Sequence, residues 1–177
     1  HPMTREDLAR FCAMKLDFES IGLIQERENT PYFCTPLGAE YVGWIGCDGV
    51  HFILLPGDER VFCVDPAMGE PGSYVLPVAE NFRTFLSYVL FCRDANPLSQ
   101  IWWLSEERFR KLLAEDAEAD WSGCEELLAR KAQTLECLGA EFSIAPADPY
   151  EAVKALQADF DPDVLTFSSE YYETLGL

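Results

Sequence analysis

Residues 41–92 read YVGWIGCDGVHFILLPGDERVFCVDPAMGEPGSYVLPVAENFRTFLSYVLFC. Short apolar runs, broken by Gly, Pro and Asp, lead into one amphipathic stretch at the end. Apolar runs of four to eight residues between turn residues are typical of β-strands, and an apolar repeat of 3.6 residues is typical of an α-helix. This stretch therefore predicts a small β-sheet with one helix laid over it.

The strand candidates within this stretch are Tyr41–Ile45, His51–Leu55, Val61–Val64 and Tyr74–Val78. Cys47-Asp48-Gly49 is expected to form the turn between the first two, because Asp and Gly tolerate positive φ. Asp65-Pro66 and Glu70-Pro71-Gly72 predict a loop before the last strand. Pro77 cannot donate a hydrogen bond to a β-ladder, so this last segment is predicted to be an edge strand or an extended arm.

The helix after the strands has the most complete pattern in the chain. Asn81 is a favoured N-cap residue, because its side chain can accept a hydrogen bond from a free backbone N–H of the first turn. Apolar residues then recur at i, i+3, i+4, i+7 and i+8, namely Phe82, Phe85, Leu86, Val89 and Leu90. This spacing places them on one face of a helix, which is predicted to cover the inner face of the sheet.

Helices are also expected on both sides of this block. A first helix is predicted from Thr4 to about Asp17, because Thr4 with Asp7 three positions later resembles a capping box in which Asp replaces the usual Glu. Gly22–Gln25 could add a strand at the start of the sheet. Later helices are expected after Ser105 and after Ser122 and Glu125, which have the spacing of a capping box.

The whole chain, residues 1–177, is predicted to form a single domain. Its length suits one hydrophobic core, its hydrophobic fraction is 49%, and no linker or repeat interrupts it. The expected fold class is α+β. In this fold, a small mixed or antiparallel sheet of about four to six strands within residues 21–78 is packed by helices before and after it.

The charge of the chain is strongly acidic. It has 13 Lys and Arg against 31 Asp and Glu, a formal net charge of −18, and residues 105–177 carry 17 of the acidic residues. A chain of this charge repels nucleic acid and anionic membranes and attracts a basic partner. We therefore expect a basic protein partner, with no nucleic-acid or membrane binding; the alternative is that the charge serves solubility alone.

The cysteines indicate a reducing compartment. There are seven of them, most in or beside apolar runs, where a thiol behaves as a small hydrophobic side chain, and an odd number cannot all pair. The first residues, HPMTREDLAR, lack the apolar core of a signal peptide, and no apolar run reaches the ~18 residues that a membrane span needs. The expected location is the cytoplasm.

Catalytic and metal-binding patterns are weak. Cys47, Asp48 and His51 could form the site of a cysteine-dependent hydrolase, but no motif of a known nucleophile accompanies them, and a turn flanked by core residues is the favoured interpretation. Cys34 and Cys63 could join Cys47 and His51 around a metal, but the close cysteine pairs of zinc sites are absent. No phosphate-binding or dinucleotide-binding glycine motif occurs. The sequence predicts a non-enzyme with no catalytic residue, no metal and no cofactor.

Tryptophans are the better candidates for a functional surface. Trp102 and Trp103 are adjacent, so a regular element cannot bury both on the same face. A tryptophan beside acidic residues is typical of binding hot spots, although packing in the core is the structural alternative. The candidate binding residues are Trp44, Asp48, Trp102 and Trp103.

The central block also resembles a known family. The segments that carry the resemblance are Gly43–Phe52, Leu55–Gly57, Val61–Val64 and Tyr74–Leu86, together with Phe167–Glu173 near the end. They are similar to the SUKH superfamily of the Smi/Knr type. In that family, a Gly-rich turn follows an early strand, and a P-(I/V)-A-x-(S/N)-F-x-x-(F/L)-L segment begins a helix.

The resemblance implies an α+β binding module without catalytic residues. Members are known or proposed as immunity proteins against bacterial toxins, often nucleases, and as scaffolds in fungal cell-wall regulation. The resemblance thus implies an immunity protein that neutralises a toxin, for example a basic nuclease. The alternative is a regulatory scaffold with no toxin partner. A nuclease must be basic to hold phosphate, so an acidic inhibitor would associate with it quickly at low salt.

Overall fold

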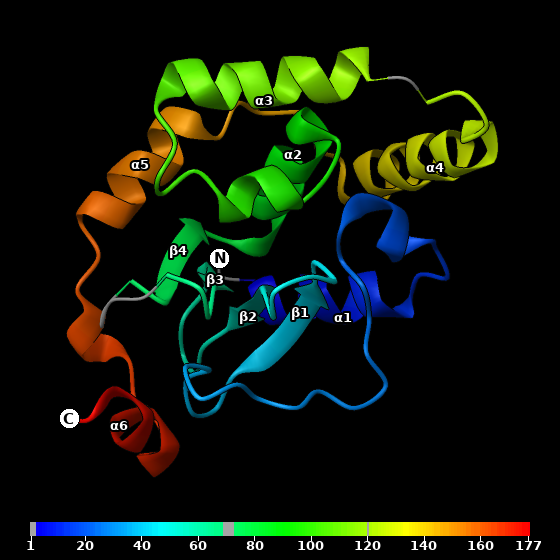
Figure 1. Cartoon of the computed structure of the whole chain (residues 1–177). Helices are drawn as coiled ribbons and strands as arrows, with labels where there is room; N and C mark the ends of the chain where they lie inside the picture. The colour runs from blue at the N-terminus through cyan, green and yellow to red at the C-terminus, as the bar shows by residue number, and fades with distance from the viewer. Residues whose placement is uncertain (1–2, 69–72, 120) are drawn as a thin grey trace.

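The computed structural model describes residues 3–68, 73–119 and 121–177. Within them lies one antiparallel sheet with strand order β1-β2-β3-β4. The strands are β1 (Glu40–Trp44), β2 (His51–Leu54), β3 (Val61–Val64) and β4 (Val75–Ala79). The sheet is therefore a meander in which each strand pairs with the next one along the chain, which confirms the predicted α+β class (Figure 1).

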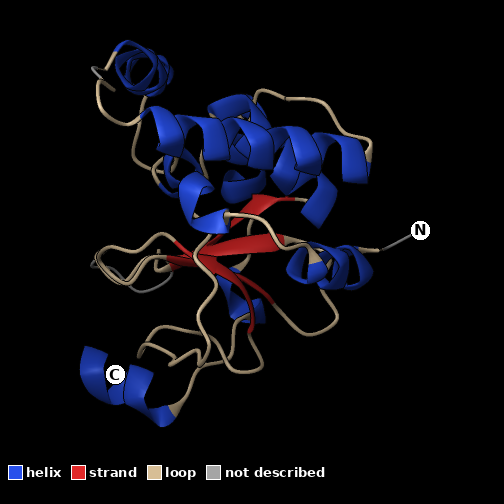
Figure 2. Ribbon diagram, turned by 90° about the vertical axis from the view of Figure 1, so that its right-hand side faces the viewer, coloured by secondary structure: helices blue, strands red, loops and turns tan. Residues whose placement is uncertain are grey.

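Helices pack around this sheet. They are α1 (Thr4–Ala13), α2 (Phe82–Cys92), α3 (Glu106–Glu118), α4 (Glu125–Phe142), α5 (Tyr150–Ala158) and α6 (Ser169–Leu175), with the 3₁₀ helices η1 (Phe18–Ile21), η2 (Asn96–Ser99) and η3 (Pro162–Val164). Figure 2 shows most of the helices on one side of the sheet, and α6 with long loops on the other. None of the helices in the described part is long and apolar enough to cross a membrane.

All four strand candidates form strands within a residue or so of their predicted ends. The fourth lies at an edge of the sheet, with a neighbouring strand on one side only. An edge strand tolerates Pro77, which has no backbone N–H to donate. The segment Gly22–Gln25 contributes only an isolated bridge between Ile24 and Trp44. The Glu70–Gly72 part of the predicted loop lies outside the described residues.

Both faces of the sheet are buried, which explains why β2 and β3 are continuous apolar runs rather than alternating ones. Phe52 and Leu54 point into a core shared with α1 and α2. Ile53 and Leu55 point into a second core on the opposite face. Strands that are apolar on both faces must therefore be covered by other segments of the chain on both sides of the sheet.

Helix α2 provides the cover on the first face. The Asn81 side chain accepts a hydrogen bond from the Thr84 N–H at 2.8 Å, as predicted for an N-cap. Phe85, Leu86 and Val89 are fully buried in the first core. The predicted role of this helix is confirmed.

The C-terminal segment covers the second face. Leu165 and Tyr171 are buried against the sheet, and the Tyr171 ring stacks on Phe167 with centroids 3.8 Å apart. Phe33, from the long loop before β1, packs edge-on against Tyr74 at 5.4 Å. Aromatic residues from distant parts of the chain thus form one cluster beneath the strands.

The first helix was predicted too long, and it ends at Ala13. Thr4 does not cap it. Instead, its hydroxyl donates to the Glu59 carbonyl at 2.8 Å and accepts from the Phe82 N–H at 3.1 Å. The buried Asp7 carboxylate accepts from Arg83 Nε at 2.9 Å. These residues tie α1 to the start of α2, and this long-range role overrides the local capping pattern.

The predicted capping box at Ser122 and Glu125 was also wrong. Helix α4 has Cys124 at its N-cap with no capping side chain, and the Glu125 carboxylate accepts a hydrogen bond from the Gly123 N–H at 3.2 Å. The carboxylate thus binds one backbone donor just ahead of the helix, and its negative charge lies in the first turn, where it is favourable.

Candidate functional site

The turn between β1 and β2 forms the centre of the candidate site. Asp48 and Gly49 have φ values of 53° and 71°, as the Asp-Gly pair predicted. The Ile45 N–H donates to the Val50 carbonyl at 3.0 Å and closes the turn. A Cβ on Gly49 would lie 2.5 Å from Cζ of Tyr32, so this position needs glycine for space as well as for conformation.

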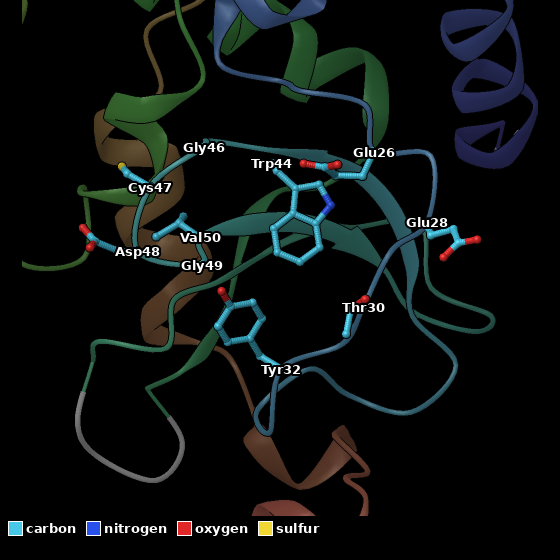
Figure 3. Close-up of a pocket in the computed structure, with 10 residues that line it drawn as sticks. All are labelled: Glu26, Glu28, Thr30, Tyr32, Trp44, Gly46, Cys47, Asp48, Gly49 and Val50. Atoms are coloured by element: carbon cyan, nitrogen blue, oxygen red, sulfur yellow. The ribbon is translucent and has the colours of Figure 1, made fainter.

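An aromatic stack supports this turn. The Trp44 and His51 rings lie 4.2 Å apart between centroids, and Tyr41 stacks on Trp44 at 5.6 Å. The Trp44 Nε1–H donates to Asn29 Oδ1 at 2.8 Å, which fixes the indole against the loop before β1. Figure 3 shows the Trp44 ring in the middle of a hollow, with Tyr32 on one side of it. The indole is half-buried, so part of it is available for contact.

His51 holds the stack in place as a neutral ring. It is fully buried, its Nδ1 lies 2.7 Å from the Gly49 carbonyl, and its Nε2 lies 3.1 Å from Thr35 Oγ1. A carbonyl can only accept, so Nδ1 carries the proton and Nε2 accepts from the Thr35 hydroxyl. Burial lowers the pKa of His51 from 6.5 to about 4, and the hydrogen bond to Gly49 opposes this only in part.

This buried histidine predicts a loss of stability in mild acid. The unfolded chain takes up a proton at His51 near pH 6.5, whereas the folded chain resists doing so until about pH 4. The free energy of unfolding should therefore fall as pH decreases from 6.5 to 4, by about 3 kcal/mol from this group. Urea denaturation at several pH values measures the fall.

A His51→Gln variant is the control, because its side chain does not titrate. Its free energy of unfolding should depend much less on pH between 6.5 and 4, while the dependence below pH 4, which comes from carboxylates, remains. Equal slopes for the two proteins between pH 6.5 and 4 would show that His51 is not held neutral by the fold.

A hollow of about 450 Å³ lies on the open side of Trp44. Glu26 and Glu28 line it together with Tyr32, which is 42% exposed. Neither glutamate forms an ion pair within the described residues, and neither Lys nor Arg lines the hollow. Figure 3 shows the Glu26 carboxylate near the indole and the Glu28 carboxylate directed away from it, at the edge of the hollow. The hollow therefore combines an aromatic wall with residues of unpaired negative charge.

A second hollow of about 570 Å³ lies on the other side of the turn. Asp48 lines both hollows, and in Figure 3 its carboxylate points away from Trp44. Trp103, 50% exposed, and the buried Asp65 line the second one, again without Lys or Arg. The turn therefore projects between two acidic hollows, each with a tryptophan in its wall.

Three of the four predicted binding residues line the two hollows: Trp44 lines the first, Trp103 lines the second, and Asp48 lines both. Trp102 is 38% exposed and lines a separate recess beside β4. The sequence did not single out Glu26, Glu28 or Tyr32, because they are close to Trp44 only through folding of the loop before β1. We use "hairpin face" for the surface formed by Glu26, Glu28, Tyr32, Trp44, Asp48 and Trp103.

No family model, curated protein or solved structure matches this chain.

The geometry does not form the Cys47–His51 pair considered from the sequence. Both ring nitrogens of His51 are engaged by Gly49 and Thr35, and the buried ring is a weak base because of its lowered pKa. All seven cysteines are free. Among the residues that the structure describes, no three His, Cys, Asp or Glu side chains are placed to hold a metal ion.

Proposed function

We propose that this chain is a non-catalytic protein-binding domain, and that a basic protein docks on the hairpin face. The observation that carries the proposal is a set of unpaired acidic residues that line the same hollow as two partly exposed aromatic rings. Glu26, Glu28 and Asp48 have no basic partner in the described structure, whereas Asp7, Asp58 and Asp148 each have an arginine. Charges left unpaired beside Trp44 and Tyr32 suit a partner that supplies Lys or Arg.

The kind of partner is proposed from charge and from the family resemblance. A net charge of −18 favours rapid association with a strongly basic protein. The sequence resemblance to the SUKH superfamily, carried mainly by residues 43–86, supports a binding module of this kind. On this basis we propose an immunity protein that neutralises a bacterial toxin, such as a basic nuclease. Seven free cysteines support a cytoplasmic location for it.

Co-expression with the products of the adjacent genes tests this function. If the proposal holds, one of these products is a basic toxin that the chain binds and inhibits. Its affinity should fall steeply as salt rises from about 0.05 to 0.5 M, because screening shortens the reach of charge interactions. Binding independent of salt, or a neutral partner, would contradict the electrostatic part of the proposal. An isolated gene without a toxin neighbour would favour the alternative of a regulatory scaffold.

A further inference from the structure

A small recess lies between the β3–β4 edge of the sheet and helix α5. Strand residues such as Cys63 and Leu76 line one wall, Ser99 of η2 and Trp102 line another, and Gln157 of α5 completes it. Its free volume is about 10 Å³, which is the space of about one water-sized group. It lies apart from the hairpin-face hollow that contains Trp44.

Gln157 is the unusual residue of this recess. Its side chain is 5% exposed, and its Oε1 is fully buried without a hydrogen-bond partner. It is the single buried side-chain N or O atom in this condition among the described residues. Buried acceptors without a donor are costly and therefore rare in folded proteins, so this oxygen calls for a donor that the chain itself does not supply.

Asp65 lines the same recess and adds a carboxylate to it. It is 7% exposed, and its Oδ1 accepts a hydrogen bond from the Ala67 N–H at 3.0 Å. No Lys or Arg pairs with it in the described part of the chain. The Ser99 hydroxyl donates to the Asn96 carbonyl at 2.7 Å, which leaves its oxygen able to accept. Three acceptors, one of them a carboxylate, thus line a space with no cation of its own.

We propose that this recess binds a primary ammonium group. The –NH₃⁺ group of an ammonium has three N–H donors and a size close to that of water, so this group alone suits the recess. The alkyl part of the molecule would extend into the neighbouring hollow, which shares Asp65, Met68 and Ser99 with the recess. A guanidinium group is planar and larger, and an anion would be repelled by Asp65. Lys154 does not fill the recess, because its Nζ donates to the Trp102 carbonyl at 3.0 Å.

An approach to the recess exists from the surface. Asp65, Met68 and Ser99 line both the recess and the larger hollow of about 570 Å³ beside it. Trp102, 38% exposed, places an aromatic ring in the recess wall, where it favours a cation. The ammonium could be the end of a lysine side chain or a free small amine. It would enter through the second hollow of the hairpin face, but its binding can be measured without any partner protein.

Methylammonium is the probe. It should cause saturable changes in the ¹H–¹⁵N NMR signals of the Gln157 side-chain amide and the Trp102 indole at constant ionic strength. A ligand of two non-hydrogen atoms is expected to bind with a dissociation constant of roughly 10 mM at best. Tetramethylammonium, which has no N–H donor and a larger size, should cause no saturable change. If methylammonium shows no saturation at roughly twenty times 10 mM, the recess holds water only and the proposal is wrong.

Two variants at one position separate binding from packing. Gln157→Leu removes the acceptor but keeps a similar volume; it should retain or raise the thermal midpoint and lose methylammonium binding. Gln157→Glu adds a negative charge and should tighten binding several-fold. Unchanged binding in both variants would overturn the assignment of Gln157 as a ligand.

The source of the ammonium is distinguished by two further probes. Nα-acetyl-lysine methylamide binding at least as tightly as butylammonium would indicate a lysine of a protein as the natural occupant. Butylammonium binding with no response to the lysine derivative would indicate a free small amine. Both results support an ammonium site. If neither amine binds, the ammonium site is wrong, whereas the docking of a partner on the hairpin face is tested separately by the charge-reversal variants.

Discussion

The Leu86→Asp variant is expected to lose the folded state altogether. Leu86 is fully buried in the first core, on the helix that covers one face of the sheet. Removing the leucine side chain from a core costs roughly 2–5 kcal/mol, and placing a carboxylate there without a partner adds several more. The total of these costs is comparable to the whole stability of a typical domain, about 5–15 kcal/mol. Thermal unfolding followed by circular dichroism should show no cooperative transition.

Phe91→Asp is the matched control. Phe91 lies on the same helix and is 36% exposed, so the new carboxylate stays in water. This variant should unfold cooperatively, with a midpoint close to that of the original chain. An unchanged midpoint for Leu86→Asp would contradict the placement of α2 over the sheet.

The strands and helix α2 could be predicted because their signals are local. The Asp48-Gly49 pair is adjacent in sequence, and so are the apolar runs on either side of it. Asn81 and the apolar repeat after it also lie within twelve residues. Neighbouring residues decide such features, and in an antiparallel meander the strand order follows the order along the chain.

The cover of the second sheet face could not be predicted in the same way. Tyr171 reaches Tyr74 and Phe33 across large separations in sequence, and aromatic residues near a chain end carry no signal of their partner. For Thr4 and Asp7, by contrast, a local pattern was present in the sequence but the structure does not use it. The two residues have the spacing of a local cap, but both side chains serve contacts about 50 to 80 residues away.

The candidate site was predicted in part. Trp44 and Asp48 could be proposed because they flank a recognisable turn, and Trp103 because of its adjacency to Trp102. The glutamates of the hairpin face could not, since Glu26 and Glu28 belong to an irregular loop that folds back over β1. Only the folded chain places these carboxylates beside the indole.

Charge reversal on the hairpin face has the second large expected effect. The triple variant Glu26→Lys/Glu28→Lys/Asp48→Lys replaces the unpaired carboxylates of three residues that line the hollow of Trp44 with ammonium groups. These side chains are exposed, so the fold should be retained. Affinity for a basic partner should nevertheless fall by about 10²-fold or more at low salt, because attraction at the contact surface becomes repulsion.

A second triple variant has the same net charge as the first one, but its substitutions lie on another surface. Asp116→Lys/Glu118→Lys/Glu136→Lys lies on α3 and α4, and none of its positions lines either hollow of the hairpin face. If the overall charge alone drives association, this variant should lose as much affinity as the first. If the partner docks on the hairpin face, it should lose only a few-fold.

Isothermal titration calorimetry of both triple variants, with the partner obtained by co-expression, tests the central claim most directly. We expect the hairpin-face variant to lose about 10²-fold in affinity and the α3–α4 variant to stay within about 3-fold of the original chain. Equal losses in the two variants, or full affinity in the hairpin-face variant, would contradict the account.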